Sequence, residues 1–330
     1  MRQKLYLLNS KTYFCALKLS PLKIFNSIQA FHSKKKTIVT IGTFDGVHIG
    51  HKKILERIKQ SALSMDCESL VLTFFPHPRM VLQENSEMKQ LNSIDEKSQL
   101  FANAGIDNLI IHPFDIEFSK LTAEEFVKTV LVDIFNIQKI IIGHDHRFGR
   151  NRTANIDDLT AFGKIYAFEV EQISAQEIND VSISSTKIRN ALLDGDVTLA
   201  NDYLGYTYSI TGTVVKGKQL GRTIGYPTAN IQVAEDYKLI PEKGVYIAQS
   251  IMDNKLVYGM MNIGFKPTVG GTVQTIEINF FDFDEDLYNQ KITVEILQRI
   301  RAEQKFESLE ALKNQLALDK ETSLSFIAKH

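Results

Sequence analysis

The chain has few cysteines, no long apolar run and almost no net charge. Only Cys15 and Cys67 occur, so neither a disulfide framework nor a zinc site is expected, and a reducing cytoplasm fits. No apolar stretch approaches the roughly 20 residues that a membrane helix needs. Lysine and arginine number 38 against 39 aspartates and glutamates, which argues against the basic footprint of a nucleic-acid-binding protein. We therefore predict a cytoplasmic protein that binds neither membrane nor nucleic acid.

Two common phosphate-binding patterns are also missing. The chain contains neither GxxxxGK[ST] nor GxGxxG, the fingerprints of P-loop and dinucleotide-binding proteins. No internal repeat or low-complexity tract is visible. The composition, 44% hydrophobic and 23% charged, is that of a globular protein. A length of 330 residues permits one domain but favours two. The oligomeric state is left open.

The N-terminus lacks acidic residues. Residues 1–36 hold eight lysines and arginines but no aspartate or glutamate. Lysine predominates, which is unlike a transit peptide, and no clean apolar region or A-x-A cleavage site follows. We expect residues 1–21 to be an untargeted, poorly ordered extension of unknown role, ahead of a domain that begins near Leu22.

The stretch TIVTIGTFDGVHIGHKKIL, residues 37–55, organises the first half of the chain. Its first residues are β-branched and apolar, which predicts a buried strand, and glycines break this strand before helical spacing begins. Such a turn presents free backbone N–H groups at a helix N-terminus, where a phosphate is favoured. His48 and His51 would share a face of the first helical turn and could donate hydrogen bonds to phosphate oxygens. A glycine-rich turn after a strand is common by itself and indicates little.

Further strands alternate with helices after this unit. We expect strands over residues 69–75, 108–112 and 139–143, and helices over residues 93–104 and 122–135. This alternation indicates an α/β fold with a parallel, doubly wound sheet. The PHPR segment around His77 follows the second of these strands, at the edge where such sheets bind ligands, although a plain strand terminator would look the same.

Two other stretches carry groups that suit anions. Residues 143–152, GHDHRFGRNR, place three arginines after a strand, and arginine forks suit phosphates; a solvated basic loop is the alternative. In residues 181–193, VSISSTKIRNALL, a hydroxyl residue caps a helix. Lys187 and Arg189 then lie in the first turn, where positive charge opposes the helix dipole unless an anion lies there.

The pattern changes near Gly205. Short alternating strands follow and predict an antiparallel barrel, and Phe306, Leu309, Leu312 and Leu316 mark an amphipathic C-terminal helix. A cut near residue 206 is expected to expose little buried surface, so that residues 22–205 and 207–330 would fold and act separately.

One loop and one glutamate in the second half of the chain are candidate ligand-binding or catalytic groups. Residues 216–230, KGKQLGRTIGYPTAN, hold glycines that let the backbone approach a ligand closely. Thr228 and Asn230 offer hard oxygen ligands acceptable to Mg²⁺ beside nucleotide phosphates. Glu277 lies in an otherwise apolar and Thr-rich strand, and a lone strand glutamate usually faces solvent.

Longer strings resemble known families. GTFDGVHIGH resembles the nucleotidylyltransferase signature in the branch of bacterial FAD synthetases, and SSTKIR resembles a motif of that superfamily. GHDHRFG resembles the family's Gly-x-Asp/Asn-Phe-x-Phe-Gly motif, with His146 where phenylalanine is usual. The second half resembles the riboflavin kinase domain, with LYNQ where Leu-Tyr-Gly is usual. From Leu22 to Ala317 the chain thus resembles the bacterial bifunctional riboflavin kinase/FMN adenylyltransferases.

The resemblance implies an adenylyltransferase domain over residues 22–205 and a riboflavin kinase barrel over residues 206–330. ATP would phosphorylate riboflavin to FMN with Mg²⁺, and a second ATP would convert FMN to FAD. Glu277 would be the base of the kinase, His48 and His51 the catalytic pair of the adenylyltransferase, and Thr228 and Asn230 the metal ligands. The expected nucleotide- or phosphate-binding residues are Gly42, Thr43, Phe44, Asp45, Gly46, Asp145, Arg150, Ser184, Ser185, Thr186, Arg189, Gly217, Gly221, Arg222 and Gly225.

Two other functions are considered. A cytidylyltransferase acting on a small phosphate ester would share the first domain, but the barrel argues against it. A non-catalytic flavin-binding regulator would not need His48, His51 and Glu277. Whether reduced flavin is required is left open.

Overall fold

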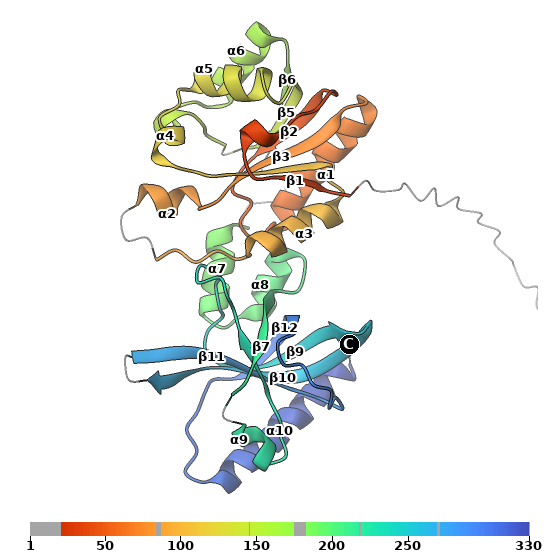
Figure 1. The fold of residues 1–330 in the computed structure, drawn as a ribbon, viewed down its shortest axis with the longest axis vertical. Coiled ribbons are helices and arrows are strands. Elements are labelled where there is room, and N and C mark those ends of the chain that lie inside the picture. The colour runs from red at the N-terminus through yellow and green to blue at the C-terminus, as the bar shows by residue number, and fades with distance from the viewer. Residues whose placement is uncertain are drawn as a thin grey trace, which may run out of the picture.

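The computed structural model describes residues 21–83, 87–144, 146–174, 183–217, 219–268 and 271–329. The described chain forms two units, a sheet covered by helices and a barrel, which lie one above the other in Figure 1. The expected extension lies outside the described residues except for Pro21. Among the described residues, no helix is both long enough and apolar enough to cross a bilayer.

The first unit is built on a six-stranded sheet in the order β1-β4-β3-β2-β5-β6, in which every pairing is parallel. The strands are β1 (Lys23–Phe25), β2 (Thr37–Ile41), β3 (Glu68–Phe74), β4 (Asn108–His112), β5 (Ile137–Gly143) and β6 (Glu169–Ile173). The helices are η1 (Ile28–Ala30), α1 (Ile49–Ser64), α2 (Pro78–Leu82), α3 (Ile94–Ala104), α4 (Ile116–Ser119), α5 (Ala123–Phe126), η2 (Val127–Val132), η3 (Arg150–Arg152) and α6 (Ile156–Tyr166).

Helices cover both faces of this sheet, so the predicted doubly wound α/β fold is confirmed. Successive strand residues point to opposite faces. Val39 packs with the apolar residues of α5, η2 and α6 on one face, whereas its neighbour Ile38 packs with those of α1 and α3 on the other. This double burial explains why the strands are continuous apolar runs.

The order of the strands determines where a ligand can bind. The chain passes from β2 outward through β3 to β4 and then returns to form β5 on the other side of β2. The order therefore reverses between β2 and β5, and ligands of open α/β sheets bind beyond the carboxyl ends at such a point. Residues 42–48 follow β2 there and His144 follows β5.

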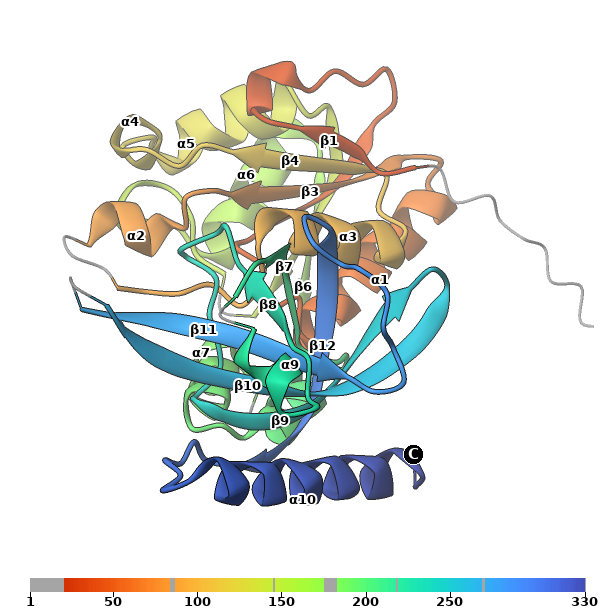
Figure 2. The same ribbon diagram turned by 60° about the horizontal axis from the view of Figure 1, so that its bottom comes forward.

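The second unit is a closed antiparallel barrel in the order β10-β11-β8-β7-β12-β9, with a terminal helix, as predicted. Figure 2 shows α10 lying along the outside of the barrel, away from the sheet unit. The strands are β7 (Ser209–Val215), β8 (Ala229–Gln232), β9 (Gly244–Met252), β10 (Lys255–Thr268), β11 (Gly271–Phe280) and β12 (Lys291–Arg301), and the helices are α9 (Leu220–Thr223) and α10 (Leu309–Ile327).

Two helix boundaries differ from the sequence-based expectation. Thr122 caps α5 with a capping box, as predicted, but the α-helix passes into the π-helix η2 after Phe126 and this ends at Val132. Helix α10 begins after Ser308, so Phe306 precedes it and lies under the Arg301 guanidinium, 5.7 Å from the ring centroid.

The helices α7 (Ser185–Leu193) and α8 (Val197–Leu204) lie between the two units (Figure 1). Their buried residues, among them Ile188, Leu192 and Leu204, belong to the same apolar cluster as Tyr208 and Ile210 of the barrel. The expectation that a cut near residue 206 would expose little buried surface is therefore wrong. The sequence pattern changes at Gly205, but the barrel core continues into α7 and α8.

This shared core predicts different stabilities for two C-terminal fragments. Burial of one large aliphatic side chain contributes about 1.5–3 kcal/mol, so a fragment of residues 207–330, which lacks both helices, should lose several such contributions. We expect a fragment of residues 183–330 to unfold at a clearly higher temperature than residues 207–330, measured by circular dichroism. Equal unfolding temperatures would show that α7 and α8 do not stabilise the barrel.

Candidate active sites

The first candidate site is the turn between β2 and α1. Helix α1 begins after His48, so the predicted strand, turn and helix are confirmed. Phe44, Gly46 and Val47 have positive φ angles of 46°, 85° and 35°. The φ of Gly46 strains any residue with a side chain, and a Cβ there would also lie 2.6 Å from the Leu91 side chain, so glycine is favoured at this position. The conformation of the turn therefore depends on these residues. Hydrogen bonds from the Gly42 N–H to the Leu72 carbonyl and from the Thr73 hydroxyl to the Thr43 carbonyl join its backbone to the end of β3.

The two histidines meet in this turn. Their rings stack with centroids 3.7 Å apart, and Phe44 packs edge-on against His51. Burial, and then the neighbouring His48 and Lys97, lower the pKa of His51 well below its usual value. His51 is therefore neutral at pH 7 and has one N–H to donate. An arriving phosphate would favour the protonated form and thus raise this pKa.

Asp45 connects the turn to α7. Its side chain is 1% exposed and accepts hydrogen bonds from the Leu91 backbone N–H at 2.8 Å and from the Arg189 guanidinium at 2.9 Å. The Ser185 hydroxyl donates to the Asp45 carbonyl at 2.8 Å. Ser184 is the N-cap of α7. The structure thus brings the GTFDGVH and SSTKIR strings together, and the Arg189 guanidinium forms an ion pair with the Asp45 carboxylate.

Lys97 and His77 are buried beside the turn, and sequence reasoning missed the first of them. Lys97 is 2% exposed, and its ammonium donates to the Thr43 carbonyl at 2.9 Å. Burial lowers the pKa of Lys97. Burial also lowers the pKa of His77 to about 4, although the nearby charge of Asp45 acts in the opposite direction. A lysine in an amphipathic helix is usually solvated, so no sequence signal marked Lys97. The PHPR segment thus lies near Asp45 and Lys97, and its role at a nucleotide site stays a prediction.

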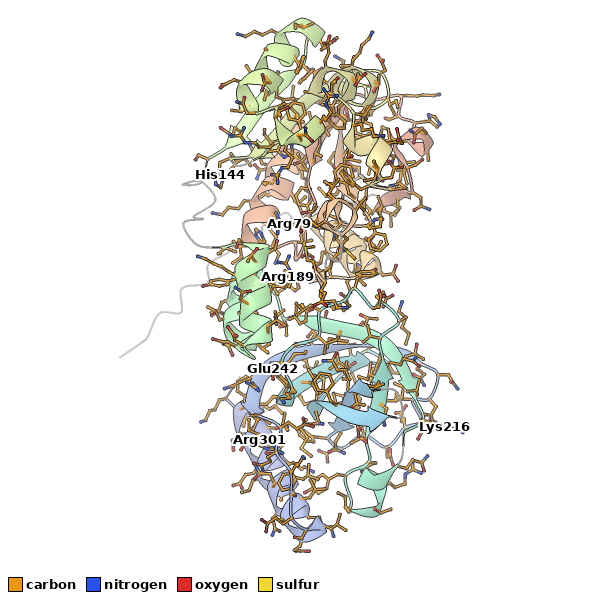
Figure 3. The ribbon with its side chains drawn as sticks, turned by 90° about the vertical axis from the view of Figure 1, so that its left-hand side faces the viewer. Arg79, His144, Arg189, Lys216, Glu242 and Arg301 are labelled. Atoms are coloured by element: carbon orange, nitrogen blue, oxygen red, sulfur yellow. The ribbon has the colours of Figure 1, made fainter. Side chains whose placement is uncertain are left out.

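The arginine stretch follows β5, and Gly149 within it lies against Ala123 of α5. Arg150 is exposed in η3, and Asp145 lies outside the described residues. The His146 ring is nearly parallel to that of Phe148, at 21° and 6.2 Å between centroids, so a flat ring is retained at this position. Figure 3 shows Arg79 and Arg189 near the junction of the two units, and His144 farther from it.

The second candidate site lies in the barrel. Strands β8 and β11 pair so that Asn230 lies opposite Glu277, and the Thr228 hydroxyl donates to the Glu277 carboxylate at 3.4 Å. The Asn279 amide donates to the Pro227 carbonyl at 2.6 Å, which holds the loop before β8. The three residues singled out in the sequence are therefore neighbours, and Glu277 is half-buried rather than a solvent-facing strand residue.

Glycines bring the backbone close to this group. A Cβ at Gly217 would clash with the Asn230 amide, and one at Gly221 with the Tyr226 carbonyl. Gly225 has a positive φ of 86°, which a side chain would strain. Arg222 is exposed on the short helix α9. Gly217 and Gly221 are thus needed for close packing within the protein, and the expected approach of this backbone to a ligand stays a prediction.

Comparisons with known proteins agree for both units. A family model described as FAD synthetase matches residues 30–187, and one described as riboflavin kinase matches residues 204–327. Bifunctional riboflavin kinase/FMN adenylyltransferase of Escherichia coli (strain K12) is 36% identical, over 88% of this chain and 92% of that protein. The protein of the same name from Listeria monocytogenes is 35% identical, over 88% of this chain and 93% of that protein.

One solved structure matches both units together. It comes from Streptococcus pneumoniae and is described as a macrolide-efflux protein; it has a TM-score of 0.84 and 30% identity, and covers 92% of this chain and 98% of that one. The fold is thus shared over both units at once, whatever the name of that protein. On the two family models and the curated relatives, this chain belongs to the bifunctional riboflavin kinase/FMN adenylyltransferase family.

Proposed function

We propose that this chain phosphorylates riboflavin to FMN in the barrel and converts FMN to FAD in the sheet unit, with one ATP used at each site. The observation that carries the proposal is the register of β8 and β11, which sets Glu277 opposite Asn230 and beside Thr228. Together with the histidine stack at the other site, it supplies separate groups for the two reactions. A cytoplasmic location is a further prediction, from the cysteine content alone.

In the barrel, Glu277 acts as general base. It accepts the proton of the ribityl 5′-hydroxyl as that oxygen attacks the γ-phosphorus of ATP and ADP leaves. Thr228 and Asn230 offer a hydroxyl and an amide oxygen, which suit Mg²⁺. No cluster of three or more His, Cys, Asp or Glu residues fit for a metal occurs in the part of the chain that the structure describes. A Mg²⁺ held by these oxygens would therefore depend on the nucleotide for further ligands, and would offset phosphate charge.

In the sheet unit, the FMN phosphate attacks the α-phosphorus of ATP, the bond to the β-phosphate oxygen breaks, and pyrophosphate leaves. No protein nucleophile is required. His48 and His51 donate hydrogen bonds to the charge that builds on the phosphorus oxygens. Arg189, oriented by Asp45, and the hydroxyl-rich start of α7 hold the phosphates.

The experiment is incubation of the full chain with riboflavin, ATP and Mg²⁺, followed by chromatography of the flavins. We expect FMN to appear first and FAD to follow. A parallel reaction with CTP tests the cytidylyltransferase alternative, which predicts a CTP-dependent product and no FAD. Flavin binding without turnover would instead indicate a non-catalytic regulator.

A further inference from the structure

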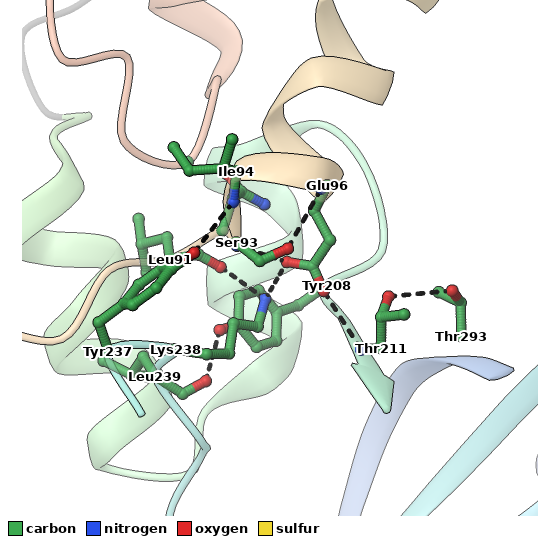
Figure 4. A network of polar contacts seen from close by, with 12 residues as sticks. Leu91, Ser93, Ile94, Glu96, Tyr208, Thr211, Tyr237, Lys238, Leu239 and Thr293 are labelled. Carbon is green, nitrogen blue, oxygen red and sulfur yellow. Dashed lines mark hydrogen bonds and ion pairs between the residues drawn. The ribbon is translucent and has the colours of Figure 1, made fainter. Parts of the chain in front are cut away.

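One short segment of the sheet unit contacts both the adenylyltransferase turn and the barrel. We call residues 89–97 the bridge segment; it leads into α3 and ends one turn inside that helix. Figure 4 shows its contacts with the barrel, which include Glu96, Lys238 and Thr211.

On one side, the bridge segment forms hydrogen bonds with residues of the first candidate active site. The Lys89 carbonyl accepts a hydrogen bond from Arg189 Nε at 3.0 Å, and the Leu91 N–H donates to Asp45 at 2.8 Å. Lys97 Nζ donates to the Thr43 carbonyl at 2.9 Å. A displacement of this segment would therefore move the turn and the guanidinium together.

On the other side, the barrel holds the bridge segment. Lys238, in the β8–β9 loop, is 3% exposed. Its ammonium donates to the Leu91 carbonyl at 2.8 Å and to Glu96 at 2.6 Å, and lies 4.3 Å from the centroid of the Tyr208 ring. Leu91 thus links the two sites of contact: its carbonyl accepts a hydrogen bond from Lys238, and its N–H donates one to Asp45.

Glu96 is the second anchor. Its carboxylate accepts from the Ser93 N–H in the capping box of α3 and from the Thr211 N–H of β7 at 3.2 Å. Removing one partner of a buried ion pair leaves the other charge uncompensated, which is strongly unfavourable. Lys238 and Glu96 therefore constrain each other, and with them the start of the helix that carries Lys97.

We propose that Lys238 of the barrel is a positioning residue for the adenylyltransferase site in the other unit. By holding Leu91 and Glu96, it fixes the bridge segment that orients Asp45, Arg189 and the Thr43 carbonyl. The first site is then complete only while the barrel is docked against it. The inference rests on the proposed function, because it assigns Lys238 to one of the two proposed reactions.

The test is Lys238→Met in the full chain, which keeps the length of the side chain but removes the ammonium. A misplacement of about 1 Å can cost as much as 10²-fold in rate, and we expect kcat/KM for ATP to fall about tenfold or more in the adenylylation of supplied FMN. Riboflavin phosphorylation should stay within about twofold, because Asn230 pairs with Val215, four residues along β7 from the Thr211 that contacts Glu96. Hydrogen–deuterium exchange of residues 42–48 should become faster.

Lys291→Met is the matched control. Lys291 also joins the barrel to α3, through Asp95 at 3.1 Å, but these side chains are 58% and 75% exposed, and exposed pairs contribute little. This variant should keep both activities. If Lys238→Met does not fold, the double variant Lys238→Met, Glu96→Gln removes the unpaired buried carboxylate, and the same selective loss is expected.

Two results would overturn the proposal. One is a folded variant that adenylylates FMN as the wild type does. The other is an equal loss of both activities, which would make Lys238 a general scaffold residue. Failure of the wild type itself to form FAD would instead contradict the proposed function, so the two failures are distinguishable.

Discussion

The double substitution His48→Ala, His51→Ala is expected to stop FAD formation while FMN still accumulates. The two rings stack in the turn between β2 and α1, at the point of the sheet where the strand order reverses. Loss of one preorganised donor to the transition state costs about 3 kcal/mol, or roughly 10²–10³ in rate. Loss of both should reduce adenylylation below detection, measured by chromatography of flavins formed from riboflavin and ATP.

The same molecule provides an internal control, because its barrel should still phosphorylate riboflavin. His32→Ala, at an exposed position of the same unit, controls for the general loss of an imidazole and should leave both activities unchanged. Circular dichroism should show that the double variant is folded. Unchanged FAD output in a folded double variant would remove both histidines from the proposed mechanism.

Glu277→Gln is expected to abolish riboflavin phosphorylation and to leave adenylylation of supplied FMN intact. Glutamine keeps the shape of the side chain and can still accept the hydrogen bond from Thr228, but it cannot take a proton. A positioned general base contributes typically about 10²–10⁴ in rate, so a loss of that size is expected. The measurement is the initial rate of FMN formation at saturating riboflavin and Mg²⁺-ATP.

Glu295→Gln is the matched control for this substitution. Glu295 also lies half-buried on a barrel strand, β12, and accepts a hydrogen bond from the Gln249 amide at 2.6 Å. It lies opposite Gln249 and not opposite the loop that holds Thr228. Normal FMN formation by Glu277→Gln, or an equal loss in both variants, would mean that the base lies elsewhere.

Features that depend only on residues close together in the sequence could be predicted from it. The β-branched run before Gly42 became β2, and the three-residue spacing of His48 and His51 placed their rings together. Ser184, one of the three hydroxyl residues 184–186 that could cap α7, is its N-cap. Edge strands β1 and β6 were not predicted; β1 is only 3 residues long, and β6 (EVEQI) has a single buried residue. Short or weakly apolar segments become strands only because an existing sheet edge pairs with them.

Contacts between distant residues could not be predicted in this way. Lys97 bonds to Thr43, 54 residues away, and Lys238 to Glu96, 142 residues away. In sequence each is a lysine like any other, and lysines are almost always solvated. Their burial depends on a carbonyl or carboxylate that another segment supplies, so no local pattern records it.

The sequence by itself determined the two architectures and the residues that carry the proposed chemistry, because periodicity, turns and motifs are local properties. Only the tertiary structure decided how the units are joined. It merged α7 and α8 with the barrel core, paired Arg189 with Asp45 and buried Lys238 against Glu96. The physical reason is that a buried charge is stable only beside an opposite charge or a hydrogen-bonding group, and an apolar side chain only against other apolar side chains. Segments far apart in the sequence supply these neighbours, and they meet only when the whole chain has folded.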